Sequence, residues 1–349
     1  MLTINLLAQE KQYYFFRPLQ YGSESTFNPI SLIANGGFDE LQAYWRPTTL
    51  SAMPWKNGSK NVWANIIAPL PQINAYGWKE FISHEIIPSS LNMENAQYYP
   101  NYSLHLIGGG MQYRKALEWF DYYGYPLPAL WAVVSAMGYH FINEIIENSG
   151  SYFYSNVDPI ADLLIFDPLG ILLFSFDGVC EFFSSKCRLN DWNSIPAFSF
   201  NPLAIRNTGQ NFIMRYPISE SGKTSLMYHF GSFGELGLSF KTSDNDAISF
   251  GVGVTSKKVY YISNNQEARR AAIKVGPMAG IYWDRNNSLM ASLAASDNFH
   301  NFLRLNIYPG VFSISSISPG LFVLLGDGGK VTVGATFHFL PLGISVYRP

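Results

Sequence analysis

The stretch Glu235–Val254, ELGLSFKTSDNDAISFGVGV, decides the fold. Its halves, Glu235–Lys241 and Ala247–Val254, alternate polar or small residues with apolar ones, and the turn-forming run Ser243–Asp246 separates them. A period of two residues places successive side chains on opposite faces of a β-strand. The stretch therefore predicts an antiparallel β-hairpin.

The same texture continues to the C-terminus. Turn signals recur at Asp284–Asn287, Ser296–Asn298 and Asp327–Lys330, a spacing typical of a meandering antiparallel sheet or barrel. The strands predicted between these turns are Ala271–Trp283, Ser288–Ala295, Phe302–Tyr308, Leu321–Leu325 and Val331–Phe339.

Composition favours a barrel in a membrane over a soluble sheet. Charged residues make up 14% of the chain, against roughly 25% in an average soluble domain. A soluble β-sandwich would place Lys, Glu and Thr on its solvent-exposed face, and these residue types are scarce in the predicted strands. We predict an antiparallel outer-membrane barrel of about 10–14 strands.

Two sets of residues support this prediction. Small residues are expected to face the lumen, and aromatic residues near strand ends are expected to form interfacial girdles. The small set is Gly237, Ser239, Ser249, Gly251, Gly253, Ser313 and Ser315, and the aromatic set is Tyr260-Tyr261, Tyr282-Trp283 and Tyr308.

The first half of the chain lacks the regular alternation of the second half, and the pattern changes near Asn190–Pro196. Phe38–Trp45 and Trp78–Ile87 are predicted as short amphipathic helices, and Tyr99–Ile107 is a candidate strand. We therefore expect residues 10–190 to hold N-terminal strands plus a helical insert or plug. Residues 191–349 are expected to form barrel strands within the same integrated domain.

An uncharged run dominates the helical insert. Tyr122–Asn143 contains no Asp, Glu, Lys or Arg and predicts a helix over Leu130–Glu147. A second apolar segment, Ile160–Phe176, carries aspartates, and we expect Asp167-Pro168 to end its helical turn. Two membrane-spanning helices are the rival interpretation. We favour helices packed against or inside a barrel, because aspartate side chains are energetically costly in a helix exposed to lipid.

The N-terminus and the cysteines add two further expectations. Residues 1–9, MLTINLLAQ, resemble the end of a signal peptide, and the alternative is an ordinary apolar first strand. Cys180 and Cys187 could close a small disulfide loop in an oxidising compartment or remain two buried thiols.

Candidate polar residues gather at the end of the uncharged run. His140 and Glu144 lie at i and i+4, so one helix face carries both, with Glu147 on the same side. Asp158 and Asp162 repeat this spacing. The other candidates are Asn143 beside the stripe, Asp167, and His105, which precedes the run Gly108-Gly109-Gly110.

Two interpretations of this polar cluster stay open. It could bind a divalent cation, or run acid–base chemistry on a lipid or glycan headgroup with His105, His140 and Glu144 as the catalytic candidates. Alternatively, Asp158 before Pro159 is an N-cap and the rest is a structural polar network. We favour the second interpretation, and so predict no metal and no cofactor.

Other function classes lack their motifs. The net charge of −2 offers no basic stripe for nucleic acid. Gly222-Lys223-Thr224 has Pro217 where a P-loop needs its first glycine. Neither Gly150-Ser151 nor Gly231-Ser232 forms a serine nucleophile elbow.

Three segments resemble an uncharacterised bacterial family whose members look like outer-membrane proteins. They are Asn101–Gly109, Phe141–Glu147 and Asp158–Gly170, and the resemblance covers roughly Asn101–Phe174. It implies location and architecture only, since the family has no assigned activity.

Three functions follow as hypotheses. The first is a non-enzymatic outer-membrane barrel, with membrane lipid and unnamed envelope proteins as partners, that supports envelope structure, assembly or solute passage. The second is a barrel-embedded enzyme acting on lipid or glycan. The third is a soluble α+β carbohydrate-binding protein with a lectin-like sandwich.

Overall fold

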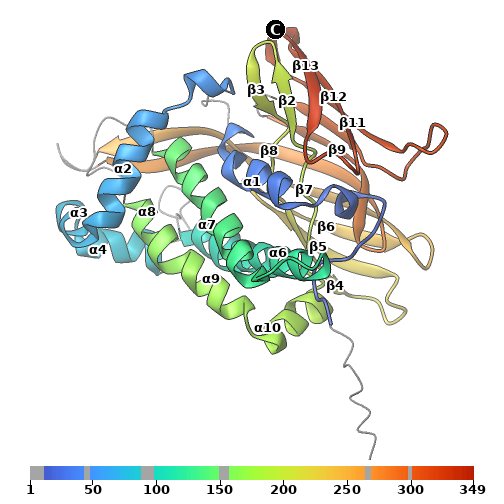
Figure 1. Cartoon of the computed structure of the whole chain (residues 1–349), viewed down its shortest axis with the longest axis horizontal. Coiled ribbons are helices and arrows are strands. Elements are labelled where there is room, and N and C mark those ends of the chain that lie inside the picture. The colour runs from blue at the N-terminus through green and yellow to red at the C-terminus, as the bar shows by residue number, and fades with distance from the viewer. Residues whose placement is uncertain (1–11, 43–47, 88–97, 149–156, 264–268, 298–300) are drawn as a thin grey trace, which may run out of the picture.

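A computed structural model describes residues 12–42, 48–87, 98–148, 157–263, 269–297 and 301–349 (Figure 1). The named elements before Asn190 are all helices, and strands follow from there. The N-terminal strands expected within residues 10–190 are therefore absent from the described part of that segment, which is helical instead. Figure 1 shows the helices gathered to one side of the strands. The segment 1–9, the end of the predicted helix Phe38–Trp45 and the turn residue Asn298 lie outside the described residues.

The helical part contains α-, 3-10 and π-helices. In chain order they are η1 (Ser23–Thr26), α1 (Pro29–Gly37), η2 (Asp39–Gln42), η3 (Leu50–Ala52), α2 (Trp55–Ile67), α3 (Pro69–Tyr76), α4 (Trp78–Phe81), η4 (Ile82–Ile86), α5 (Tyr98–Pro100), η6 (Asn101–Gly109), α6 (Gly110–Tyr122), α7 (Pro128–Glu147), α8 (Asp158–Ala161), η7 (Asp162–Phe166), α9 (Asp167–Phe174), α10 (Asp177–Glu181) and η8 (Phe182–Lys186).

The predicted uncharged helix is confirmed as α7, with Pro128 in its first turn. Two other expectations were wrong. Tyr99–Ile107 is not a strand, because most of it belongs to the π-helix η6. Asp167-Pro168 does not end its helix, since the π-turn η7 precedes Pro168 and Pro168 falls in the first turn of α9.

The strands form one 13-stranded sheet. They are β1 (Asn190–Asp191), β2 (Ala197–Phe200), β3 (Leu203–Arg206), β4 (Phe212–Pro217), β5 (Thr224–Phe230), β6 (Phe233–Lys241), β7 (Asp246–Ser263), β8 (Arg269–Arg285), β9 (Ser288–Ser296), β10 (Leu303–Ile307), β11 (Pro319–Leu325), β12 (Val331–Phe337) and β13 (Gly343–Arg348), and a 3-10 turn, η9 (Asp327–Gly329), joins β11 to β12.

The sheet is mixed, and its order is β1-β4-β5-β6-β7-β8-β9-β10-β11-β12-β13-β2-β3. Neighbours are antiparallel except β13 and β2, which are parallel. The hairpin that decided the prediction is β6–β7, paired in register from Phe233–Thr255 to Lys241–Ala247. The mainly β architecture with a helical part is therefore confirmed.

One face of the sheet encloses a core of its own. The core joins residues of non-neighbouring strands, and Trp192 and Tyr282 pack within it with ring centroids 5.6 Å apart. Arg215 on β4 reaches Asp284 on β8 with bonds of 2.7 and 3.0 Å. Contacts between strands so far apart in the order require the sheet to curl around this face.

Four side chains lie elsewhere than predicted. Tyr282 and Tyr308 are buried in this core and form no girdle, because their rings pack inside the curled sheet. Ser313 and Ser315 are exposed in the β10–β11 loop and do not face inward. Ser239, Ser249 and Gly251 are buried, as predicted. The side chains of Tyr260 and Tyr261 lie outside the described part of the chain.

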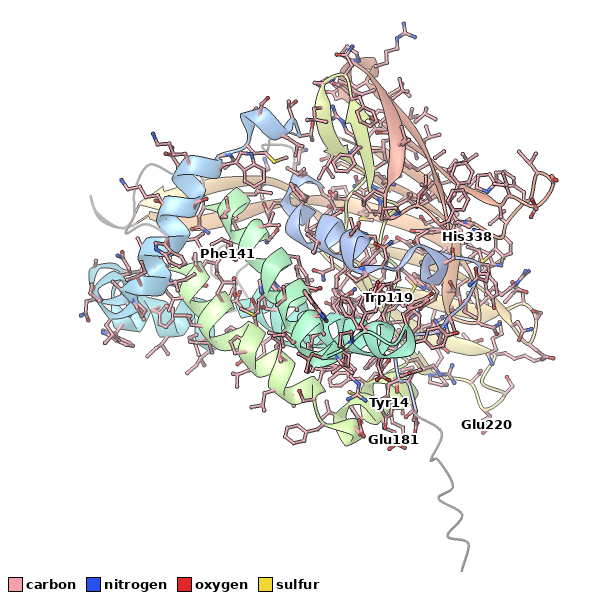
Figure 2. All side chains as sticks on the ribbon, in the orientation of Figure 1. Tyr14, Trp119, Phe141, Glu181, Glu220 and His338 are labelled. Atoms are coloured by element: carbon pink, nitrogen blue, oxygen red, sulfur yellow. The ribbon has the colours of Figure 1, made fainter. Side chains whose placement is uncertain are left out.

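A second core lies between the helices and the opposite face of the sheet. Phe212 and Phe230, on β4 and β5, stack with ring centroids 5.3 Å apart and pack against Met111 and Phe174 of the helices. Figure 2 shows Trp119 of α6 within the helical side of the molecule, whereas Glu220 and His338 lie among the strand connections. Burying apolar faces of this kind stabilises by about 25 cal/mol per Å² of area removed from water.

Polar side chains of α1 and η2 form hydrogen bonds with the backbone of the sheet near the connection between β1 and β2. Asn35 donates to Ser194 O at 3.2 Å and accepts from Gly209 N at 3.0 Å. Asp39 accepts from Gln210 N at 2.7 Å. Asn35 near the end of α1 and Asp39 at the start of η2 thus serve backbone groups that no neighbouring strand satisfies.

Asp39 makes stability depend on pH. Burial raises its pKa to about 7, although the bonds from Gln210 and Gln42 oppose the shift. A raised folded-state pKa means that the folded protein retains a proton that the unfolded chain releases above about pH 4. The free energy of unfolding should therefore fall as pH rises from 5 to 8, by roughly 2 kcal/mol from this group.

The variant Asp39→Asn should remove this slope, because the amide oxygen still accepts both bonds. Its Tm relative to wild type should rise between pH 5 and 8 in a thermal denaturation series. Asp244→Asn, at an exposed turn position, is the matched control and should leave the slope unchanged. Parallel Tm curves for Asp39→Asn and wild type would contradict the assignment.

By length and hydropathy, α7 is the one described helix that could cross a membrane, and 44% of its apolar window is buried inside the protein. The bent pair Asp158–Phe174 and Asp177–Lys186, with an angle of 88°, passes only when taken together. We treat both as packing helices, since their polar residues face one another.

Cys180 and Cys187 are free thiols.

Candidate functional site

Four helical elements bring the predicted polar residues together. His105 lies in the π-helix η6, His140 on α7, Asp162 at the start of η7 and Asp167 at the start of α9. π-Turns widen a helix by one residue and recur at functional sites. Here they set His105 and Asp162 facing each other from neighbouring helices.

The centre of the site is Asp167 between two histidines. Asp167 Oδ1 lies 2.9 Å from His105 Nδ1 and 3.1 Å from His140 Nε2. The two imidazole rings lie 4.7 Å apart at an angle of 32°. On the other side of its ring, His105 Nε2 lies 3.4 Å from Asp162 Oδ2. We call these four residues the histidine–aspartate centre.

Glycines allow this close approach. A Cβ at Gly109 would lie 2.7 Å from His140 Nε2. A Cβ at Gly170 would lie 2.7 Å from Leu106 O and 3.0 Å from His105 O. The helices that carry His105 and Asp167 can therefore cross only through glycine, which explains part of the run Gly108-Gly109-Gly110.

Further carboxylates continue from the centre. Glu144 is hydrogen-bonded to Asp162 and accepts from Asn148 Nδ2 at 3.0 Å. Asp158 is hydrogen-bonded to Glu85. Ligand atoms of Glu144, Glu147 and Asp158 lie within 4.8 Å of one another. Acidic groups this close repel one another when all are ionised, so at least one must be protonated or a cation must lie among them.

Burial dominates the electrostatics of the site. The exposed fractions of His105, His140 and Asp167 are 7%, 4% and 2%. Burial raises the pKa of the Asp162 and Asp167 carboxyl groups, in spite of the opposing effect of His105 on Asp167. Burial and then the neighbouring His105 lower the pKa of His140. The site therefore favours neutral groups unless a cation compensates the carboxylates.

The structure brings most sequence-predicted residues into one cluster. His105, His140, Glu144, Asp158, Asp162 and Asp167 are buried there, and Glu147 is half-buried beside them. Asn143 is also half-buried, and its Oδ1 has no hydrogen-bond partner in the described part of the protein. Sequence reasoning did not assign Glu85 to the cluster. Burial raises the pKa of Glu85 to about 7.

No family model matches this sequence, and comparisons with curated proteins and with solved structures give no match. Fold and site therefore define the class of protein by themselves. It is a curled, mainly antiparallel sheet with a helical layer on one side, and that layer encloses a buried histidine–carboxylate cluster.

Proposed function

We propose that this chain is an outer-membrane β-barrel protein that acts without catalysis as an envelope component, with membrane lipid around its strands. The observation that carries the proposal is the distribution of side chains across the strands. Large apolar residues are exposed on the outer face, whereas the inner face buries polar side chains beside its aromatic core. An apolar outer face on most strands is unusual for a soluble sheet and is typical of a barrel in lipid.

The outer face is apolar along most of the sheet. Val252 on β7 is 68% exposed and Val346 on β13 is 75% exposed. Other large apolar residues exposed on the strands are Phe200, Leu226, Leu236, Leu238, Phe240, Phe250, Val254, Ile281, Leu293, Val333 and Ile344. Monomeric soluble proteins rarely expose a contiguous apolar surface of this extent.

The inner face carries hydrogen-bonded polar groups. His229 lies 3.0 Å from Glu235, and Asn207 donates to Asn306 at 2.7 Å. These side chains fill most of the interior, and inner-face residues line cavities of about 50, 80 and 280 Å³. The smallest has room for a few water molecules. A filled interior supports a structural or assembly role over passage of a solute.

Closure of the sheet into a barrel is part of the proposal. β1 pairs with β4, and β2 pairs with β3, in the same antiparallel register, as in a hairpin of the two longer segments 190–200 and 203–217. Between these pairs, the backbone N–H groups of Trp192 and Ser194 donate to Asn211 O and Gly209 O and continue the ladder. Merging β1 with β2 and β3 with β4 turns 13 strands into 11. The first and last strands of an odd-numbered meander run the same way, so a ring built from them would need one parallel pair, and the parallel pairing of β13 with β2 supports closure of this kind.

The enzymatic alternative has less support. A catalytic histidine must reach its substrate, whereas His105 and His140 are 7% and 4% exposed. The buried cluster fits a role inside the protein better than chemistry on a lipid or glycan.

The substitution Val252→Lys separates a membrane barrel from a soluble sheet. A lysine facing the bilayer midplane costs about 2–4 kcal/mol, whereas an exposed valine on a soluble sheet can become lysine at little cost. We expect wild-type protein from the membrane fraction to run compactly on electrophoresis until boiled. Val252→Lys should strongly reduce the compact band.

Thr242→Lys, in the exposed β6–β7 turn, is the control and should behave as wild type. The proposal fails if the wild-type protein is soluble without detergent and shows no heat-dependent shift. It also fails if Val252→Lys folds as well as Thr242→Lys.

A further inference from the structure

We propose that the histidine–aspartate centre binds one divalent first-row transition ion, such as Mn²⁺, Fe²⁺ or Zn²⁺, through His105, His140 and Asp167. The inference goes beyond the barrel proposal and is independent of it. It reverses the expectation from sequence, in which capping and a structural polar network accounted for these residues.

The spacing of the donor atoms fits a metal ion. One ligand atom from each of the three residues lies within 4.8 Å of the others. Two ligands at about 2.1 Å from an ion and at right angles to each other are about 3.0 Å apart. Asp167 Oδ1 lies 2.9 Å from His105 Nδ1 and 3.1 Å from His140 Nε2, so both distances match edges of a coordination polyhedron.

Unpartnered carboxylate oxygens point to the same conclusion. No N–H or O–H donor in the described part of the protein reaches the buried oxygens Asp167 Oδ2, Asp162 Oδ1 and Glu144 Oε1. Glu144 and Asp162 pair carboxyl to carboxyl, so a proton or a cation must lie between them. Asp167, Asp162 and Glu144 are 2%, 1% and 0% exposed, so bulk solvent cannot donate hydrogen bonds to their oxygens. A buried acceptor left unpaired is costly, and one divalent ion would compensate several carboxylates at once.

The donor set selects the kind of ion. Two imidazoles with a carboxylate suit Mn²⁺, Fe²⁺ or Zn²⁺, whereas Ca²⁺ and Mg²⁺ prefer oxygen donors throughout. Asp162 contacts the other nitrogen of His105 at 3.4 Å. A carboxylate in that position orients a metal-binding histidine and fixes its tautomer. The burial of the whole centre fits a structural ion more than a catalytic one.

Metal content and thermal stability test the proposal. Detergent-purified protein is stripped with EDTA, incubated with Mn²⁺, Fe²⁺, Zn²⁺ or Co²⁺ singly, desalted and analysed by mass spectrometry for metal. We expect about one ion per chain from at least one of these incubations and a higher Tm with that ion bound. No retained ion and no change in Tm with any of the four would overturn the proposal.

The variant Asp167→Asn separates a metal site from a hydrogen-bonded network. Asparagine Oδ1 can still accept from both histidines, so a structural network would keep its Tm without metal. Metal affinity should fall at least about 100-fold, since even second-shell changes cost 10–100-fold. His338→Asn, at an exposed position, is the control.

Wild-type metal affinity in Asp167→Asn would overturn the assignment of the ligand. If Asp167→Asn does not fold, His140→Gln replaces it with the same expected loss. Heat-modified mobility of the same preparations reports on the barrel alone, so a failed metal site and a failed barrel give different results.

Discussion

Replacing Lys115 with methionine is expected to lower the free energy of unfolding by about 3–5 kcal/mol, because it leaves a buried charge without its partner. Lys115 on α6 is 1% exposed and pairs with Glu24 at 2.9 Å and with Asp191 on β1. The lysine thereby ties the helical layer to the first strand. Denaturation in detergent, followed by circular dichroism, measures the change.

A second substitution tests whether the loss comes from charge. Arg17 also binds Glu24, at 2.8 Å, so the group holds two cations and two anions. Lys115→Met leaves one excess negative charge, and the double variant Lys115→Met/Asp191→Asn restores the balance. We expect the double variant to be more stable than Lys115→Met alone.

The control for this series is Lys186→Met, at an exposed position in η8. It should change stability by no more than about 0.5 kcal/mol. A double variant as unstable as Lys115→Met would show that lost packing, and not an unpaired carboxylate, causes the effect.

The substitution Gly170→Ala is expected to destabilise the protein by about 3 kcal/mol and to disturb the histidine–aspartate centre. The added Cβ would lie 2.7 Å from Leu106 O and 3.0 Å from His105 O. Both are backbone atoms, so the crossing of η6 and α9 must open to admit the methyl group, and overpacking of this kind costs roughly 1–3 kcal/mol or more.

Gly138→Ala on α7 is the matched control, since nothing lies within 4 Å of its added Cβ. Alanine is favoured over glycine inside a helix by about 1 kcal/mol, so Gly138→Ala should be neutral or stabilising. Thermal denaturation of both variants checks the pair. Equal Tm values for Gly170→Ala and Gly138→Ala would contradict the close crossing.

The strands were the most predictable part of the fold. The hairpin β6–β7 and the strands up to β12 follow from alternation and turn residues, which are properties of neighbouring residues in the chain. The helix α7 was predictable for the same reason, as a long uncharged run. Local signals failed at Tyr99–Ile107 because a π-helix has no simple sequence period. They failed at Pro168 because the π-turn η7 ends just before it and Pro168 falls in the first turn of α9, where proline is tolerated.

The residues of the candidate site were predictable as types, but their geometry was not. Spacing placed His140 and Glu144 on one helical face. It could not show that Asp167 would lie between His140 and His105, since His105 and Asp167 are 62 positions apart. Glu85 carried no signal at all, because a lone glutamate on a short helix is ordinary in sequence.

The sequence by itself determined which segments form strands and helices and which chemical groups are available, because alternation, turns and charge content act over a few residues. On β6 and β7 the small residues already indicated the enclosed face, whereas tertiary structure alone decided that Tyr282 and Tyr308 are enclosed. It also decided that two histidines meet one aspartate. Those outcomes depend on helix crossings and strand curling, which pack groups distant in the chain and exclude water from them.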